Sequence, residues 1–189
     1  MATLWMTSDT HFGHKNRMPG DRDFKDITAH DEALIENWNK RVKRDDIVIH
    51  FGDVGLANDS YILGCVARLK GHKHLITGNH DAVWPGHRDA HKHQRRWMEH
   101  FESVQAYGTR RFGKQRIVMS HLPYFGDHTE KARYAEWRLP NTGDLLLHGH
   151  VHDKWLVNEN QINVGVDVWK LRPVMFDELV EFARSLGLL

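Results

Sequence analysis

Seven side chains with oxygen or imidazole nitrogen donors stand in five short polar clusters along the chain. These side chains are Asp9, His11, Asp53, Asn79, His121, His150 and His152. Carboxylate, carboxamide and imidazole groups without a thiolate suit divalent first-row metals of borderline hardness, such as Mn, Fe, Zn or Co. Seven ligands are too many for one ion and match two ions if one carboxylate bridges them. The residue types therefore predict a two-metal site.

The spacing of these residues supports the same chemistry. Asp9 and His11 are two residues apart, as are His150 and His152, and side chains at this spacing can point the same way where a strand ends. Gly149 precedes the second pair and lets the backbone approach an ion closely. Histidine is also abundant, with 16 among 189 residues, and neutral imidazole is the commonest metal ligand. This abundance exceeds what folding requires.

Each polar cluster follows a short apolar run. The runs are residues 4–6, 47–49, 75–76, 117–119 and 145–147. Aliphatic runs of this length, closed by Gly or a polar turn, predict strands that are buried on both faces. Ligands of open α/β sheets bind beyond the carboxyl ends of the strands. We therefore expect the five clusters to converge on one rim.

Apolar residues at helical spacing over residues 34–42 and 62–69 predict two helices between the first three strands. Thr28 and Asp31 are start signals upstream of the first helix, and Asp59 is the expected N-cap of the second, with Gly71 just past its end. Alternating strands and helices predict parallel pairing with right-handed crossovers.

Further along the chain, the pattern predicts two hairpins and a last helix. Residues 104–112 and 115–119 form the first hairpin, residues 155–157 and 162–164 the second, and residues 177–186 the helix, with Leu186 buried. No linker, repeat or low-complexity segment interrupts the chain. We therefore expect a single domain over residues 1–189.

Composition excludes several classes of protein. The net charge of +1 gives no strong attraction to nucleic acid or membranes. A single cysteine, Cys65, excludes an intramolecular disulfide and a thiolate metal cluster, and a reducing cytoplasm is the simplest compartment. The chain shows no signal-peptide pattern, and no apolar run approaches the ~18 residues that span a bilayer. We expect a cytoplasmic protein without a membrane partner.

The order D-x-H, G-D, G-N-H-D, H and G-H-x-H resembles the calcineurin-like metallophosphoesterase superfamily. The blocks here are Asp9-Thr10-His11, Gly52-Asp53, Gly78-Asn79-His80-Asp81, His121 and Gly149-His150-Val151-His152. One block alone is weak evidence, whereas five in order, each at an expected strand end, are not a coincidence. The opening residues 8–14 and the short chain look most like the small bacterial and phage phosphoesterases of this superfamily.

The resemblance implies a fold, a cofactor and a role for each residue. The fold is an α/β sandwich of the four-layer type, with two central mixed sheets flanked by helices. The cofactor is a pair of divalent ions, Mn first, with Fe, Zn, Co or Ni as alternatives. The implied ligands are Asp9, His11 and His152 for the first ion, Asn79, His121 and His150 for the second, and Asp53 as the bridge. His80 is similar to the catalytic histidine of the family, which contacts the phosphate or protonates the leaving oxygen.

These roles imply a metal-dependent hydrolase in which a hydroxide between the two ions attacks a phosphate ester. We expect phosphodiesters, such as cyclic nucleotides or nucleic-acid-derived esters, because a chain of 189 residues has little room for a cap that would close the site. The alternatives are a phosphomonoesterase acting on nucleotides or proteins, which two or more arginines in the metal site would favour, and a nuclease. A non-catalytic scaffold is disfavoured because every expected ligand is present.

Several residues admit two interpretations. His14 and Asn16 either line the substrate pocket or cap a loop. His50 and His148, which stand near motif glycines, are interpreted as core histidines with satisfied hydrogen bonds. Asp81 either orients His80 or caps the following turn, and the turn is favoured.

Two segments outside the motifs carry basic residues. Residues 84–100 contain Arg88, Lys92, Arg95 and Arg96 at helical spacing, which indicates either a stripe for a polyanion or, as we favour, a solvated helix face. Residues 122–142 form an expected loop at the rim whose aromatic and basic side chains either contact substrate or pack the loop down. The native substrate, the metal, the oligomeric state and the pathway stay open.

Overall fold

Two five-stranded mixed sheets stand at the centre of the structure, a computed structural model that describes residues 2–14 and 22–189. The first sheet has the order β10-β1-β2-β3-β4, and the second β5-β6-β7-β9-β8. The strands of the first sheet are β10 (Val174–Met175), β1 (Leu4–Thr7), β2 (Ile47–His50), β3 (His72–Ile76) and β4 (Ser103–Gln105). Those of the second are β5 (Tyr107–Phe112), β6 (Gln115–Ser120), β7 (Leu145–His148), β9 (Gln161–Asn163) and β8 (Val157–Asn158). The α/β fold with two central mixed sheets is confirmed.

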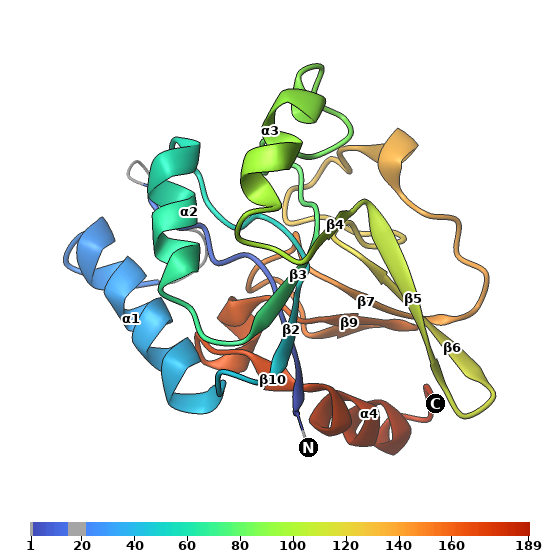
Figure 1. The fold of residues 1–189 in the computed structure, drawn as a ribbon. Helices are drawn as coiled ribbons and strands as arrows, with labels where there is room; N and C mark the ends of the chain where they lie inside the picture. The colour runs from blue at the N-terminus through green and yellow to red at the C-terminus, as the bar shows by residue number, and fades with distance from the viewer. Residues whose placement is uncertain (1, 15–21) are drawn as a thin grey trace.

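In the first sheet, β1, β2 and β3 pair in parallel as predicted, and β4 also pairs in parallel with β3. Three crossover helices lie together along this sheet (Figure 1). They are α1 (Ile27–Arg41), α2 (Asp59–Ala67) and α3 (Ala90–Trp97). The N-cap of α1 is Asp26, whose carboxylate accepts from Ala29 N at 2.8 Å, so Thr28 is inside the helix. The N-cap of α2 is Asn58 rather than Asp59, because Asn58 Oδ1 accepts from Tyr61 N at 3.0 Å.

The first sheet contributes side chains to a core on each of its two faces. Trp5 and Leu75 pack against the helices, whereas their neighbours Met6 and Ile76 pack into a second core between the two sheets. Adjacent residues of a strand point to opposite faces, so the short apolar runs serve two cores at once. The last helix, α4 (Phe176–Ser185), closes one edge of the second core through Leu179.

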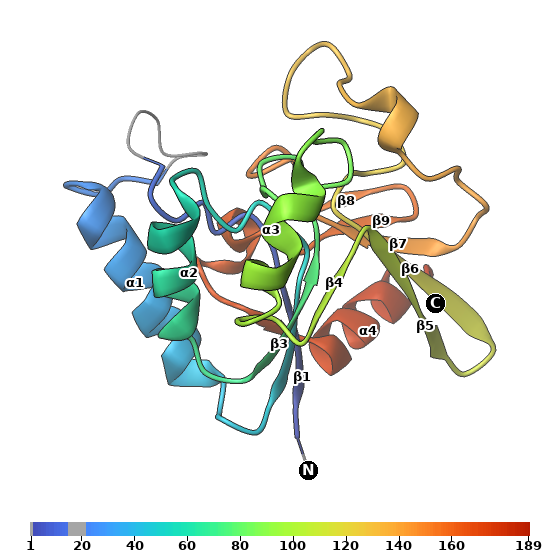
Figure 2. The same cartoon turned by 45° about the horizontal axis from the view of Figure 1, so that its top comes forward.

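The outer face of the second sheet is covered by the segment 122–139 and its short 3-10 turn η1 (Ala135–Trp137). Figure 2 shows this part of the chain arching above β7, β8 and β9. Arg138 packs the segment down, because its guanidinium donates to the carbonyls of Pro123 at 3.2 Å and Gly126 at 2.6 Å. A second 3-10 turn, η2 (Val166–Trp169), follows β9.

Three predictions about the later elements need correction. Residues 103–105 are not part of the first hairpin, because they pair in parallel with β3, and only β5 and β6 form the antiparallel pair. The second hairpin is shorter than predicted: β8 and β9 pair over two residues each, and the turn between them contains Glu159, which has a left-handed backbone conformation. Leu186 follows the end of α4 and is 46% exposed instead of buried. Among the helices of the described ranges, none is both long and apolar enough to cross a bilayer.

Candidate metal centre

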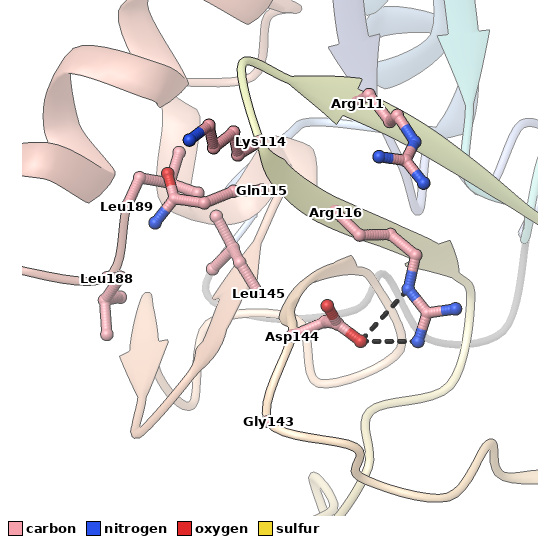
Figure 3. A pocket seen from close by; sticks show the side chains of 9 residues that line it. All are labelled: Arg111, Lys114, Gln115, Arg116, Gly143, Asp144, Leu145, Leu188 and Leu189. Carbon is pink, nitrogen blue, oxygen red and sulfur yellow. Dashed lines mark hydrogen bonds and ion pairs between the residues drawn. The ribbon is translucent and has the colours of Figure 1, made fainter.

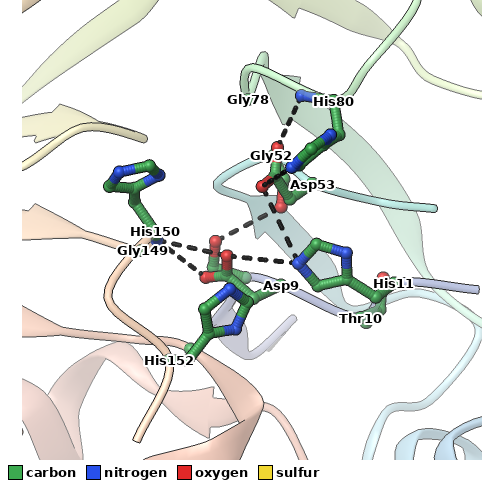
Figure 4. A network of polar contacts seen from close by, with 12 residues as sticks. Asp9, Thr10, His11, Gly52, Asp53, Gly78, His80, Gly149, His150 and His152 are labelled. Atoms are coloured by element: carbon green, nitrogen blue, oxygen red, sulfur yellow. Dashed lines mark hydrogen bonds and ion pairs between the residues drawn. The ribbon is translucent and has the colours of Figure 1, made fainter. Parts of the chain in front are cut away.

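The structure brings all seven candidate ligands together at the carboxyl ends of β1, β2, β3, β6 and β7. The seven are Asp9, His11, Asp53, Asn79, His121, His150 and His152, and all are buried. Asp9, His11, Asp53 and His152 point toward one another in Figure 4. Loop backbones connect the strand ends directly: the Asp9 amide donates to the Gly52 carbonyl at 3.0 Å, and the His150 amide donates to the Asp9 carboxylate at 3.0 Å.

The candidate ligands form two groups that share one carboxylate. Asp9, His11 and His152 each offer an atom within 4.8 Å of the other two, and so do Asp53, His121 and His150. Asn79 joins the second group, since its Oδ1 lies 3.2 Å from His121 Nε2. Asp53 Oδ2 lies 3.7 Å from His11 Nε2 and 3.4 Å from His121 Nε2. The Asp53 carboxylate thus lies between the groups.

Five of the seven residues hold a left-handed backbone conformation. Their φ angles are 58° at Asp9, 51° at His11, 52° at Asp53, 71° at His150 and 52° at His152. This conformation costs a residue with a side chain about 1–2 kcal/mol, and such strain concentrates at functional sites. Glycines make the arrangement possible, because a Cβ at Gly149 would overlap Ser8 Oγ and the Asp9 carboxylate.

The electrostatics of the cluster fit bound cations. Both nitrogens of His11 are buried and find no hydrogen-bond partner among the described residues, although an unpaired buried group costs about 1–3 kcal/mol. Burial would raise the pKa of Asp9 and Asp53, but the neighbouring histidines hold both well below the usual range. Burial lowers the pKa of His11 to about 4. Two ionised carboxylates and an unpaired imidazole suit divalent ions.

The hydrogen bonds of His121 also direct one of its nitrogens toward the other candidate ligands. Its Nδ1 donates to the Phe51 carbonyl at 2.7 Å, which leaves Nε2 facing Asp53 and Asn79. Burial opposes the charged imidazole, yet the Asp53 carboxylate outweighs burial and raises the pKa of His121 to about 9. A metal at this nitrogen would therefore replace a proton.

Two carboxylates that the sequence analysis missed lie next to His150 and His152. His150 Nε2 lies 3.3 Å from Asp127 Oδ2, and His152 Nδ1 lies 3.4 Å from Asp167 Oδ2. Arg138 donates to Asp127 at 2.9 Å, and Arg22 to Asp167 at 2.6 Å and 2.9 Å. Carboxylates in this position fix the tautomer and orientation of metal-binding histidines. Neither aspartate belongs to a motif block, so no local signal marks it.

His80 stands at the open side of the cluster. Its side chain is 37% exposed, its backbone amide donates to Asp53 Oδ1 at 2.9 Å, and its Nε2 lies 4.0 Å from Asp53 Oδ2. The His14 ring lies 5.6 Å from that of His11, so His14 also borders the cluster. Asn16 lies outside the described residues. The geometry places His80 where a substrate could reach both it and the candidate ligands.

Other polar residues near the strand ends have structural contacts. His50 bonds Thr10 Oγ1 at 3.0 Å and accepts from the Gly52 amide at 3.1 Å, and burial lowers its pKa to about 3. His148 donates to the Gly149 carbonyl at 2.7 Å. Asp81 accepts from the amides of Gly78, Asp53 and Val54. Both ring nitrogens of His50 thus have partners, as expected of a core histidine, whereas Nε2 of the buried His148 has none among the described residues. Asp81 binds amides of its own loop and of the β2 loop rather than those of the turn that follows it.

Similar proteins identify the family. The calcineurin-like phosphoesterase superfamily domain matches residues 3–171. The Gene 66 proteins of Mycobacterium phages L5 and D29 are 35% and 36% identical to this chain, over 98% of it and over 96% and 98% of their own lengths. The solved structure of a protein of unknown function from Aquifex aeolicus is 25% identical, with a TM-score of 0.71 over 96% of this chain and 100% of that one. This chain belongs to the calcineurin-like phosphoesterase superfamily.

Proposed function

We propose that this protein is a two-metal phosphodiesterase. Family membership implies hydrolysis of phosphate esters. The observation that carries the two-metal proposal is the Asp53 carboxylate, which lies 3.7 Å from His11 Nε2 in one group of candidate ligands and 3.4 Å from His121 Nε2 in the other. A carboxylate in this position can bind two ions at once.

The proposed ligands follow the two groups. Asp9, His11 and His152 hold the first ion, Asn79, His121 and His150 hold the second, and Asp53 binds both. Two divalent ions, when bound, lower the pKa of water between them and neutralise charge on the phosphate. Manganese is the expected metal. Its identity and the cytoplasmic location stay predictions.

His80 is the proposed catalytic histidine. Its exposure and its position beside Asp53 let it meet a substrate that the ions bind, where an imidazole can protonate the leaving oxygen or contact the phosphate. His14 is a proposed substrate contact, because it is half-buried beside His11.

The arginines near the centre favour a diester over a monoester. A monoester carries an extra negative charge, which arginine guanidinium groups would bind. In the described part of the chain, Arg22 pairs with Asp167, and Arg133 and Arg138 pair with Asp127. The guanidinium groups of these three arginines are thus already paired with carboxylates.

The nuclease alternative has less support. Lys92 pairs with Asp89 at 2.8 Å, and Arg96 donates to Ser60 of α2 at 2.7 Å. Over residues 84–100, these contacts tie α3 to its own N-terminus and to α2. They agree with a solvated helix face.

Metal reconstitution tests the proposal. We expect chelated protein to be inactive, to bind two Mn ions per chain by elemental analysis, and then to hydrolyse bis(p-nitrophenyl) phosphate faster than p-nitrophenyl phosphate. Asp89→Asn is a matched control, because Asp89 is an exposed carboxylate that pairs with Lys92. Full turnover by metal-free protein would contradict the two-metal reaction, and a preference for the monoester would contradict the diester assignment.

A further inference from the structure

A pocket with aromatic walls opens beside His121. It has a volume of ≈280 Å³ and is lined from the end of β3, the loop before α3, the β4–β5 junction, the end of β6 and η1. Small-molecule pockets usually measure about 300–1,000 Å³. A space just below that range suits one ring system rather than a large ligand.

Two exposed aromatic side chains border this pocket, Trp137 with 42% and Tyr107 with 55% of their surface accessible. The Trp137 ring centroid lies 5.0 Å from that of the buried Trp84, which in turn packs on Tyr134 at 5.4 Å. The Trp137 indole is therefore held in place from one side while its surface stays open to solvent. A fixed, exposed aromatic surface is suited to stacking with a planar group.

Polar residues also line the pocket, among them Thr77 at the end of β3 and Ser120 at the end of β6. A pocket with both aromatic and polar residues in its lining suits a heteroaromatic ring better than a hydrocarbon ring.

His121 links the pocket to the proposed reaction. It lines the pocket, and its Nε2 lies 3.4 Å from the Asp53 carboxylate. A phosphate bound at the metal centre would therefore have one ester arm next to the pocket opening. We propose that this pocket binds a nucleobase carried by one arm of the phosphodiester, so that the substrates are nucleoside esters. The proposal rests on the two-metal phosphodiesterase function.

A second pocket differs in character. It lies between the β5–β6 hairpin and the C-terminus, has a volume of ≈390 Å³, and is lined by charged residues including Arg111, Lys114 and Arg116 (Figure 3). Arg116 is paired with Asp144, and the lining contains none of the candidate ligands. This pocket therefore lacks both the aromatic wall and the link to the metal centre.

The test compares substrates that differ only in a base. The Mn-loaded protein is given the dinucleotide TpT and two analogues in which one thymine or the other is replaced by hydrogen. Stacking of a base on an aromatic side chain contributes about 1–3 kcal/mol, so loss of the base that fills the pocket should lower kcat/KM by roughly 10-fold or more. Trp137→Ala should remove this difference. The control Met98→Ala, which changes an exposed apolar side chain at the C-cap of α3, should preserve it.

A binding measurement separates this proposal from the proposed function. Tryptophan fluorescence of the Mn-loaded protein should respond to thymidine 5′-monophosphate at lower concentration than to deoxyribose 5-phosphate, and Trp137→Ala should abolish that preference. Equal affinity for the two ligands, or equal kcat/KM for TpT and both analogues, overturns the nucleobase pocket even if bis(p-nitrophenyl) phosphate is hydrolysed. A preference for the nucleotide in a protein that hydrolyses no diester supports the pocket and contradicts the proposed reaction.

Discussion

The two groups of candidate ligands are supported by different parts of the molecule. Behind the first group, Arg22 is buried, pairs with Asp167, and donates to the backbone carbonyls of Asp9 at 2.6 Å and Thr10 at 3.1 Å. Behind the second group, Asp127 lies in the segment that covers the second sheet and pairs with both Arg133 and Arg138. The first support connects the β1 loop with η2, whereas the second lies within the segment 122–139.

This difference indicates how independent the two groups can be. Removing Arg22 would leave Asp167 buried with His152 as its remaining partner, and it would release the β1 loop that carries Asp9 and Thr10. Removing Arg138 would leave Asp127 with Arg133. We infer that the first group is coupled to the stability of the fold, and that the second can be altered with the fold intact.

The largest expected effect comes from Asp53, the proposed bridge, whose carboxylate lies near His11 of the first group and His121 of the second. Asp53→Asn removes a charge that both ions would share, so it should weaken both sites together and lower diester turnover by roughly 10³-fold or more, since each 1.36 kcal/mol lost from the transition state is a factor of ten. Mn titration calorimetry and turnover measure this. Two ions retained with near-native turnover would show that Asp53 does not bridge them.

The next effect belongs to His80, which contacts Asp53 through its backbone amide and is not a proposed ligand. His80→Ala should keep both ions and lower turnover by about 10²–10⁴-fold, the usual contribution of a general acid. The loss should be smaller for a nitrophenolate leaving group, which needs little protonation, than for a ribose oxygen. Equal losses on both substrates would indicate that His80 contacts the phosphate instead of donating a proton.

The free energy of unfolding should distinguish the support by Arg22 from the support by Arg138. Breaking a buried ion pair costs about 3–5 kcal/mol, so Arg22→Ala should lower the free energy of unfolding of the metal-free protein by about that amount. Arg138→Ala should cost less, about 1–3 kcal/mol, because Arg133 still pairs with Asp127 and the bonds that are lost, to Asp127 and to the Pro123 and Gly126 carbonyls, all lie within the segment 122–139. Urea unfolding compares the two variants. A larger loss for Arg138→Ala would reverse the comparison.

Features that depend on neighbouring residues in the chain could be predicted from the sequence. The strand ends and the seven candidate ligands could be placed because each polar cluster directly follows its apolar run. The helix starts were missed by a few residues, since Asp26, Asn58 and Asp59 are all suitable capping residues and only the backbone geometry chooses among them. The roles of the candidate ligands stay predictions.

Long-range polar pairs could not be predicted. Arg22 and Asp167 are 145 positions apart, and neither lies in an apolar period or a motif block. Residues 103–105 were predicted to pair with the wrong strand for a similar reason. The sequence of a short strand does not indicate which of the two sheets it joins. The choice of β3 over β6 is made by the packing of the whole domain.

Asp127 and Asp167 give the smallest and most selective prediction. Loss of a carboxylate behind a metal-binding histidine typically weakens metal affinity 10–100-fold, so Asp127→Asn should weaken the second ion through His150, and Asp167→Asn the first ion through His152. Two-step Mn titrations, with circular dichroism to verify folding, resolve the two sites. Asp144→Asn is the control, because it removes a carboxylate paired with Arg116 away from the centre. If both variants weakened the same ion, or neither weakened any, these aspartates would be structural and the two groups would not have separate supports.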